Sequence, residues 1–363
     1  MYIYQQVGWP RFNFSQDAVA SVLEACHIAQ GRLLTKMEQL GLSERNDKIL
    51  LTITKDIIKS SEIEGHILNH EQVRSSVARR LGMEMAGLVS SSRDTEAVVE
   101  MMLDATQNYQ KPLTRERLFG WHSCLFPTGY SGLYKVDVGT YRKHPVQVVS
   151  GAIGREKIHY EAPAAERIPS EMEAFLRWVN APQGDGLIKS ALAHLWFVTL
   201  HPFDDGNGRI ARTISDMLLC QSDKTSYRFY SMSNQIVVER SEYYTILERT
   251  QKGSLDVTQW IEWFLHCVFK AICSSEQQTD AVLKKYSFLR SIEHVPLNER
   301  QRMMLTRLVS DTWFGILTSS KWAKIAKCSS DTALRDIQDL LQKGLLQKEP
   351  TSGGRSTNYK LLG

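Results

Sequence analysis

A polar, glycine-rich turn between two apolar stretches is the feature that most limits how this chain can fold. Residues 191–200 (ALAHLWFVTL) precede the turn, and residues 210–220 (IARTISDMLLC) follow it. Apolar side chains recur at three- and four-residue spacing on both sides, which predicts two helices buried in a core. The turn at 201–208 (HPFDDGNG) must therefore place its polar groups where one helix ends and the next begins.

The same spacing predicts that most of the chain is helical. A break in this pattern at residues 139–163 predicts an isolated β-hairpin, with its turn at 150–154. The polar run SSEQQTD (274–280) precedes a further predicted helix that ends at Arg290. The expected fold class is mainly α. The predicted helices are 17–41, 45–63, 71–81, 93–110, 114–125, 170–180, 187–200, 208–221, 241–251 and 257–271.

Composition excludes several classes of protein. No run of 18 or more apolar residues occurs, so we expect no membrane span. The start, MYIYQQVGWPRF, lacks the basic and apolar regions of a secretory signal. Six cysteines are scattered without CxxC pairs, which indicates reduced thiols in a cytoplasmic protein rather than a zinc site.

The C-terminal part differs in charge from the rest of the chain. Residues 297–363 hold eleven Lys and Arg against six Asp and Glu, a net of +5, and the remainder has a net of −1. Three predicted helices, then two strands around a turn at 352–355, are the order of a winged helix-turn-helix. We predict four parts: an N-terminal helical region, a catalytic core, a linker helix and the winged helix, at 1–110, 111–275, 276–296 and 297–363.

The central turn has the chemistry of a phosphate site. Gly206 and Gly208 allow consecutive N–H groups to converge at the start of a helix, where the dipole also favours an anion. Arg209 and Arg212 share one helical face and could both reach a polyphosphate. His201 is a base suited to neutral pH. A carboxylate in such a site requires a cation, which indicates Mg²⁺.

The segment from His201 to Arg212 resembles the signature of the Fic family, His-Pro-Phe-x-Asp-Gly-Asn-Gly-Arg-x-x-Arg, and meets every specified position. The chain contains no GxxxxGK[ST] motif. The resemblance implies a Fic-type helical bundle that transfers AMP from ATP to a Tyr, Thr or Ser hydroxyl of a target protein, and to itself.

The resemblance also implies a role for each matched residue. His201 would remove the proton of the target hydroxyl, and Asp205 would hold Mg²⁺ between the α- and β-phosphates. The backbone of Gly206, Asn207 and Gly208 would cradle the phosphates. Arg209 would help to neutralise them, and Arg212 would hold the γ-phosphate. Asp204 falls at the variable position and receives no role.

Two further segments fit this resemblance. The hairpin is similar to the family's flap, which aligns a target by strand addition, and its candidate residues are Val146, Val148 and Val149. The residues that match the adenine pocket are Tyr243, Tyr244, Leu247 and Gln251. These four are spaced for one helical face, and the tyrosines suit a core equally well.

The helix predicted at 45–63 ends in a motif that resembles the inhibitory motif of Fic proteins, Ser60-x-x-x-Glu64-Gly65. Glu64 continues an apolar stripe, where a carboxylate is costly unless a cation meets it. The resemblance implies that Glu64 pairs with Arg212 and so keeps Arg212 from the γ-phosphate. A frayed polar helix end is the plainer explanation of Glu64.

Three alternatives remain open. The chain could be a DNA-binding regulator that uses its C-terminal part, although Asp331, Asp336 and Asp339 on the third C-terminal helix would repel phosphates. It could use another nucleotide donor. It could also remove AMP, with Glu64 activating water. The sequence leaves open the identity of the target and whether two copies form a homodimer.

Overall fold

The computed structural model describes residues 1–83, 87–150, 155, 157–182, 184–309, 316–349 and 357–362. It divides into two compact units, Met1–Gln277 and Gln278–Gly363. The predicted hairpin turn at 150–154 falls mostly outside the described residues, and the C-terminal turn at 352–355 falls wholly outside them. The two units are considered separately.

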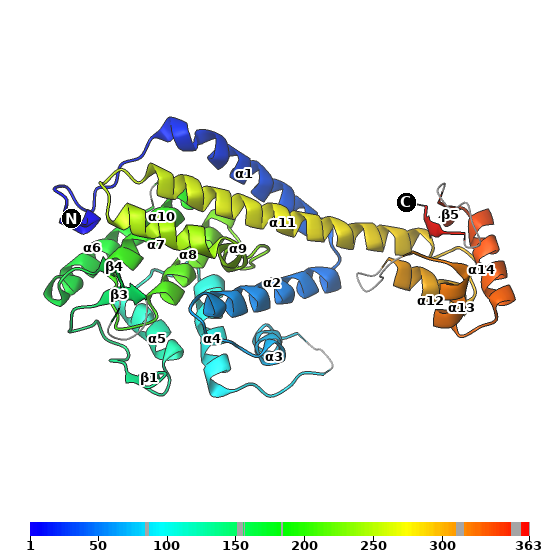
Figure 1. The fold of residues 1–363 in the computed structure, drawn as a ribbon, viewed down its shortest axis with the longest axis horizontal. Helices are drawn as coiled ribbons and strands as arrows, with labels where there is room; N and C mark the ends of the chain where they lie inside the picture. The colour runs from blue at the N-terminus through cyan, green and yellow to red at the C-terminus, as the bar shows by residue number, and fades with distance from the viewer. Residues whose placement is uncertain are drawn as a thin grey trace. The chain divides into compact units, whose positions relative to one another are not determined.

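Unit 1 is built almost entirely of helices, as predicted (Figure 1). Two short 3₁₀ segments and two small hairpins complete it. Its elements in chain order are η1 (Ile3–Gln5), α1 (Gln16–Gln39), α2 (Leu42–Ile63), α3 (His70–Arg80), α4 (Arg93–Gln107), α5 (Arg115–Leu125), β1 (Tyr130–Ser131), β2 (Tyr134–Lys135), β3 (Gln147–Ser150), β4 (Lys157–Glu161), η2 (Ala165–Arg167), α6 (Ile168–Asn180), α7 (Gly186–Leu200), α8 (Asn207–Asp223), α9 (Met232–Val238), α10 (Arg240–Gln251) and the start of α11 (Thr258–Ser291).

Helices α7 and α8 form the centre of unit 1, and they pack against each other more extensively than any other two described helices. Asp185 caps α7 by accepting hydrogen bonds from two backbone N–H groups. Every residue of α7 from Ala193 to Leu200 is buried. A helix that is apolar on all sides is stable only inside a core, so α7 fixes the position of the turn that follows it.

Helices α1 and α11 run alongside each other in the same direction (Figure 1). The Cys26 thiol donates to the carbonyl of Leu265. Nearer their C-terminal ends, Arg32 and Lys36 both pair with Glu276. These contacts explain why α1 stays ordered against the helical core.

The prediction of a break at 274–280 was wrong, because α11 continues from Thr258 to Ser291. Two of the polar side chains in this run are buried. Ser275 is buried and donates to the carbonyl of Phe229, and Thr279 is fully buried. With no glycine or proline in the run, nothing in it ends a helix.

The 3₁₀ segments η1 and η2, helix α9 and the β1–β2 hairpin were not predicted. Helix α9 fills the segment before α10, where Ser231 caps it and Asp56 of α2 accepts from the N–H of Ser233. The hairpin of β1 and β2 has only two residues in each strand. Neither segment is long enough to show a period that distinguishes a helix or strand from a loop.

The predicted hairpin is confirmed as the antiparallel pair β3 and β4. These two strands form a two-stranded sheet, and within the described part of the chain each keeps one edge without a strand partner. The Tyr160 hydroxyl donates to the carbonyl of Thr199 at 2.7 Å, which fastens β4 to the end of α7. The rings of Tyr2 and Tyr4 pack against that of Tyr160, so the N-terminal segment supports strand β4 of the hairpin.

Unit 2 contains the elements in the order predicted for the C-terminal part. They are the end of α11, then α12 (Glu299–Leu308), α13 (Ser319–Ala326), α14 (Ser330–Gln342), β5 (Leu346–Lys348) and β6 (Tyr359–Leu361). Strands β5 and β6 pair antiparallel. The unit has its own core, which includes Met304, Trp322 and Ile337.

No described helix is long and apolar enough to pass through a membrane. The six cysteines are all unpaired, and three of them are buried. Burial raises the pKa of the Cys26 thiol to about 12, which indicates that this residue packs as a small apolar group.

Candidate active site

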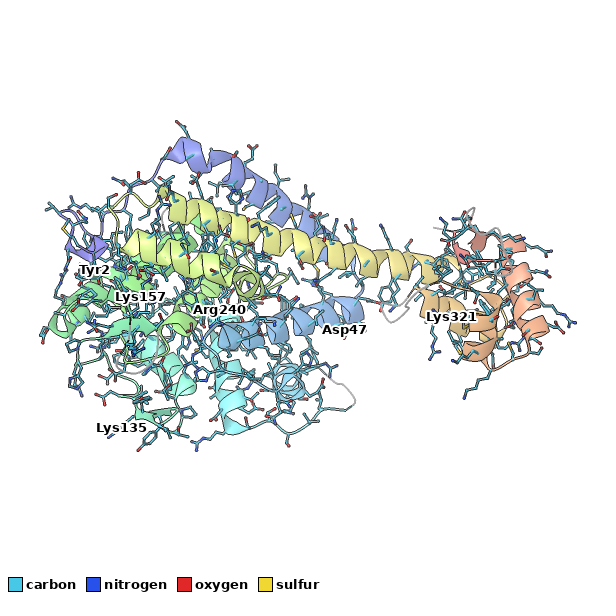
Figure 2. All side chains as sticks on the ribbon, in the orientation of Figure 1. Tyr2, Asp47, Lys135, Lys157, Arg240 and Lys321 are labelled. Carbon is cyan, nitrogen blue, oxygen red and sulfur yellow. The ribbon has the colours of Figure 1, made fainter. Side chains whose placement is uncertain are left out.

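Most of the residues expected at the site line one cleft of about 890 Å³ in unit 1. The cleft lies where the turn between α7 and α8 meets α10 and the β3–β4 hairpin. Figure 2 shows Lys157 of β4 and Arg240 of α10, both of which line the cleft. The expected residues in its lining are Glu64, Val146, Val148, Val149, His201, Asp205, Gly206, Asn207, Gly208, Tyr243, Tyr244, Leu247 and Gln251.

His201 ends α7 in a left-handed conformation with φ 49°. Its Nδ1 lies 3.1 Å from the carbonyl oxygen of Val198. A carbonyl can only accept, so Nδ1 carries the proton and the Nε2 lone pair is left as the basic site. Burial lowers the pKa of His201 below its ordinary 6.5. The imidazole is therefore neutral at pH 7 and can take a proton.

The turn is held in shape by the side chain of Asn207. Its Oδ1 accepts from the N–H of Phe203 at 3.0 Å, and its Nδ2 donates to the carbonyl of Phe203 at 2.8 Å. Both backbone groups of Phe203 are buried and require partners. The sequence suggested only a backbone role for Asn207, and this bracing role of its amide was missed.

Arg142 was also missed, and it joins the turn to the hairpin. Its Nε donates to the carbonyl of His201 at 2.7 Å, and its two terminal nitrogens donate to the carbonyls of His144 and Pro163. The side chain is 2% exposed. One guanidinium thus fixes the carbonyl of the candidate base relative to both ends of the flap. No motif marks this arginine in the sequence.

His122 of α5 supports the turn from the opposite side. The N–H of Gly139 donates to its Nδ1 at 3.1 Å, so its Nε2 carries the proton and donates to the carbonyl of Asp205 at 3.2 Å. Its ring stacks on Phe203 at 4.2 Å between centroids. Burial lowers the pKa of His122 to about 4, so it acts as a fixed neutral donor.

Both carboxylates of the turn, Asp204 and Asp205, line the cleft, and Asp205 is the one expected to hold Mg²⁺. Its Oδ2 accepts from the hydroxyl of Ser131 on β1, and its Oδ1 accepts from the N–H of Gly206. Among the described residues, no group of three or more His, Cys, Asp or Glu side chains is placed to hold a metal ion. A single carboxylate suits Mg²⁺ when substrate phosphates supply the other ligands. Asp204, by contrast, accepts from the N–H of Asp137 and braces a neighbouring loop.

The N-terminus of α8 opens into the cleft. Gly206 precedes the helix with φ 80°, and no side chain caps it. The first N–H groups of a helix have no acceptor within the helix, and they carry its positive dipole end. A Cβ at Gly206 would come within 2.9 Å of Leu125. Glycine is required here because both the backbone angle and the packing exclude a side chain.

Arg209 and Arg212 do not line the cleft, although both were expected to reach a polyphosphate. Arg209 is 6% exposed and lies over the ring of Phe126 at 5.1 Å from its centroid. Arg212 lies beneath the turn, 2% exposed. The shared helical face was predicted correctly, but these packing partners could not be.

Two of the three residues expected in an inhibitory motif, Ser60 and Glu64, contact Arg212 at the end of α2. The Ser60 hydroxyl accepts from Nε of Arg212 at 3.0 Å, and the Ser60 carbonyl accepts from Nη2 at 2.9 Å. Glu64 Oε1 also accepts from Nη2, at 2.9 Å. Gly65 follows with φ 79° and ends the helix there. The buried Nη1 of Arg212 has no hydrogen-bond partner among the described residues.

The Glu64 carboxylate also occupies space above the turn. A Cβ built on Gly208 would lie 2.2 Å from Glu64 Oε1. Any side chain at Gly208 would therefore collide with this carboxylate. Glu64 thus covers the start of α8 as well as pairing with Arg212, and its side chain remains 31% exposed to the cleft.

Arg240 holds Glu64 in place and was not anticipated from the sequence. Its Nη2 donates to the carbonyl of Ile63, the residue before Glu64, at 2.6 Å. The Tyr244 hydroxyl contacts the same carbonyl at 3.4 Å. Helix α10 therefore fastens the C-terminal end of α2, which would otherwise be free to fray.

A second polar contact fastens α2 one turn earlier. Asp56 of α2 and Asp216 of α8 are both buried, and Arg228 pairs with Asp216 at 3.1 Å. Burial and the neighbouring Asp56 raise the pKa of Asp216 well above its ordinary value. The contact adds to the Glu64–Arg212 pair in joining the two helices.

The four residues expected at the adenine pocket differ in how deeply they are buried. Tyr243 is buried, and its hydroxyl contacts Nε2 of His194 at 2.9 Å, so it serves the core as well as the cleft. Tyr244 and Leu247 are more open to the cleft. Gln251 is buried, with its Nε2 3.4 Å from the carbonyl of Val198 that also accepts from His201.

The flap residues lie where a target could reach them. Val148 and Val149 of β3 are 36% and 48% exposed, and Val146 precedes the strand and accepts from the N–H of Ala162. His159 of β4 contacts Glu248 of α10 at 2.7 Å and ties the hairpin to the far side of the cleft. The arrangement places a neutral base, a carboxylate and a helix N-terminus beside an open strand edge.

Comparisons with known proteins agree with this geometry. Residues 112–219 match the Fic/DOC family, and residues 2–83 match a domain of unknown function (DUF4172). The chain is 32% identical over 270 residues to the protein adenylyltransferase Fic of Drosophila melanogaster, which covers 71% of this chain and 46% of that protein. It is 31% identical over 116 residues to the uridine 5'-monophosphate transferase of Xanthomonas campestris pv. campestris (strain 8004), covering 30% of this chain and 21% of that protein. The chain spans less than half the length of these relatives.

The fold is similar to a solved structure of a Fic family protein from Desulfovibrio desulfuricans G20. The TM-score is 0.57 at 20% identity, and the match covers 98% of each chain. The predicted fold class, a mainly helical Fic-type bundle, is confirmed.

The buried neutral histidines predict how stability responds to acid. Burial lowers the pKa of His122 to about 4 and that of His194 to about 3. Between these values and 6.5 the unfolded chain binds a proton that the folded chain does not, so stability falls as pH falls through this window. The expected loss is about 1.4 kcal/mol per pH unit for each histidine. Chemical denaturation at pH 7.5, 6.5, 5.5 and 4.5 measures it.

A His122→Gln variant provides the control. Glutamine can donate to the Asp205 carbonyl and accept from Gly139 without titrating, so the pH slope should decrease by about 1.4 kcal/mol per unit. An unchanged slope would show that His122 is not the group that titrates.

Proposed function

Residues 112–219 of this chain form a Fic/DOC family domain, and on this premise we propose that the chain transfers AMP from ATP to a Tyr, Thr or Ser hydroxyl of a target protein and of itself. The observation that carries the proposal is the meeting of His201, Asp205 and the uncapped N-terminus of α8 in one cleft. A base, a carboxylate suited to a cation and an anion-binding helix end are what transfer of a nucleotide from a triphosphate requires.

The proposed reaction follows from the positions of these groups. Nε2 of His201 takes the proton of the target hydroxyl, whose oxygen forms a bond to the α-phosphorus. The bond from that phosphorus to the bridging oxygen of pyrophosphate breaks, and pyrophosphate leaves. The N–H groups at the start of α8 stabilise the charge on the phosphate oxygens. Asp205 would hold Mg²⁺, which neutralises phosphate charge when bound.

The flap would align the target. Its free strand edge can pair with an extended segment of the target, so that backbone hydrogen bonds set the position of the hydroxyl. Such backbone pairing selects a target only weakly by its side chains. The tether through Arg142 keeps the hairpin at a fixed distance from His201.

We further propose that Glu64 restrains this activity. It accepts from Arg212, which the reaction would need for the γ-phosphate, and it covers Gly208 at the start of α8. Both effects would oppose binding of the triphosphate in the position that transfer requires. Truncating one partner of a buried pair leaves the other without compensation, but here the freed guanidinium would meet a phosphate.

The role of the base is tested with His201→Ala. Transfer of AMP should fall by about 10²–10⁴-fold, because proton removal is lost while positioning is retained. Nucleotide binding should stay near that of the unmodified chain, measured by calorimetry with ATP and Mg²⁺. Transfer at an undiminished rate would remove His201 from the mechanism.

The restraint is tested with Glu64→Gly. Incorporation of labelled AMP into the chain should rise by about ten-fold or more, which corresponds to ~1.4 kcal/mol of relieved competition. Glu64→Gln removes the charge but keeps the bulk. Its incorporation of AMP should therefore lie between that of the unmodified chain and that of Glu64→Gly. Glu62→Gln, the same change two residues earlier, should have no effect. Equal incorporation by Glu64→Gly and the unmodified chain would contradict the restraint.

The donor is tested by intact mass. Incubation of the Glu64→Gly chain with ATP, GTP, CTP or UTP, each with Mg²⁺, should give a mass increase of one AMP with ATP alone. The similarity to a uridine 5'-monophosphate transferase makes UTP the competing donor. A larger yield of UMP adduct than of AMP adduct would replace ATP as the donor and keep the reaction type.

A further inference from the structure

Helices α13 and α14 of unit 2 form a helix-turn-helix. The turn between them has three residues, and the first, Lys327, is left-handed with φ 51°. Ser329 then caps α14 by accepting from the N–H of Thr332. Trp322 of α13 and Ile337 of α14 share one buried core. The motif therefore fixes one face of α14 inward and leaves the other exposed.

The acidic residues of α14 would be an obstacle to nucleic acid, but two of the three are paired with basic side chains of unit 2. Asp336 is 5% exposed and accepts from Arg300 at 3.0 and 3.2 Å and from Asn298 at 2.8 Å. Asp339 accepts from Gln301 at 2.7 Å and is paired with Lys343. Both carboxylates are thus compensated within unit 2.

What remains on the exposed side of α14 is a face with the chemistry of base recognition. We define the α14 face as Ser330, Asp331, Leu334, Arg335 and Gln338, all of which are exposed. Arg335 and Gln338 are three residues apart, so they lie on one side of the helix. Arginine pairs with guanine and glutamine with adenine at major-groove edges.

Four basic side chains of the same unit are exposed. Lys324 and Lys327 are exposed at the end of α13, directly before α14 in the chain, and Lys348 and Lys360 are exposed on the β5–β6 hairpin. Residues 297–363 carry a net charge of +5. The two described carboxylates that pair with Arg300 and Lys343 do not reduce the charge on these four lysines. The positive charge of these exposed lysines is complementary to a polyanion such as a nucleic acid backbone.

We propose that the α14 face of unit 2 binds duplex DNA in the major groove. The middle of α14 presents Arg335 and Gln338 to base edges, and Lys324 and the hairpin lysines contact phosphates. This binding is separate from the proposed transfer of AMP and would bring the enzyme to a nucleic acid. A docking site for a protein is the competing use of such a motif, and the test distinguishes the two.

The first measurement uses the full chain and a labelled 30-base-pair duplex of random sequence. The affinity should fall steeply as salt rises from 50 to 200 mM, because phosphate contacts release counterions. Lys324→Glu should weaken binding by roughly ten-fold. Lys111→Glu makes the same charge change at an exposed position of unit 1 and should alter the affinity by less than about two-fold.

The second measurement uses a gain of affinity, which misfolding cannot imitate. Asp331 is the one carboxylate of the α14 face, so Asp331→Asn should tighten binding to the same duplex at 100 mM salt. Selection from a random duplex pool should enrich a sequence that Arg335→Ala no longer prefers, since a bidentate arginine pair contributes roughly 5- to 150-fold. No binding at 50 mM salt, or equal effects of Lys324→Glu and Lys111→Glu, would overturn the proposal in favour of protein docking.

Discussion

The structure of unit 1 depends on how the turn between α7 and α8 satisfies its polar backbone. The turn lies against a buried helix, where an unpaired N–H or carbonyl is costly. Asn207 serves both backbone groups of Phe203, Arg142 serves the carbonyl of His201, and His122 serves the carbonyl of Asp205. One side chain of the turn and two from outside it therefore fix its shape, and Gly206 leaves the start of α8 without a side-chain cap.

This arrangement explains why the same residues can serve stability and chemistry. His201 uses Nδ1 to satisfy a helix carbonyl, and this bond sets the tautomer that makes Nε2 basic. Asp205 is held by Ser131 from the β1–β2 hairpin. The groups that face the cleft are thus oriented by contacts outside it, as a site that does not reorganise during reaction requires.

Helix α2 is joined to α8 by two polar contacts rather than by apolar packing alone. Arg212 binds Ser60 and Glu64, and Asp216 lies beside Asp56 one turn earlier along α2. Arg240 adds a third contact from α10. A helix held by charged pairs can be released by a competing anion more readily than one held by buried leucines, because an anion can replace a carboxylate at a guanidinium. The proposed restraint is consistent with this kind of attachment.

The amino-acid sequence by itself determined the helical class, the flap hairpin and the position of the candidate base. Periodicity sets which face of each helix is buried, and the fixed spacing of the turn from His201 to Arg212 is a local property of the chain. It did not reveal that α11 is continuous, because a buried Ser275 and a solvated one look alike in sequence.

Only the tertiary structure decided the partners of the charged residues. It placed Arg142 on His201, Arg240 beside Glu64, and Arg209 on Phe126 instead of in the cleft. It also turned Asp336 toward Arg300. These pairs join residues far apart in the chain. The periodicity of the sequence does not identify the partner of a charged residue. Burial sets its need for a partner, and packing alone selects which partner is within reach.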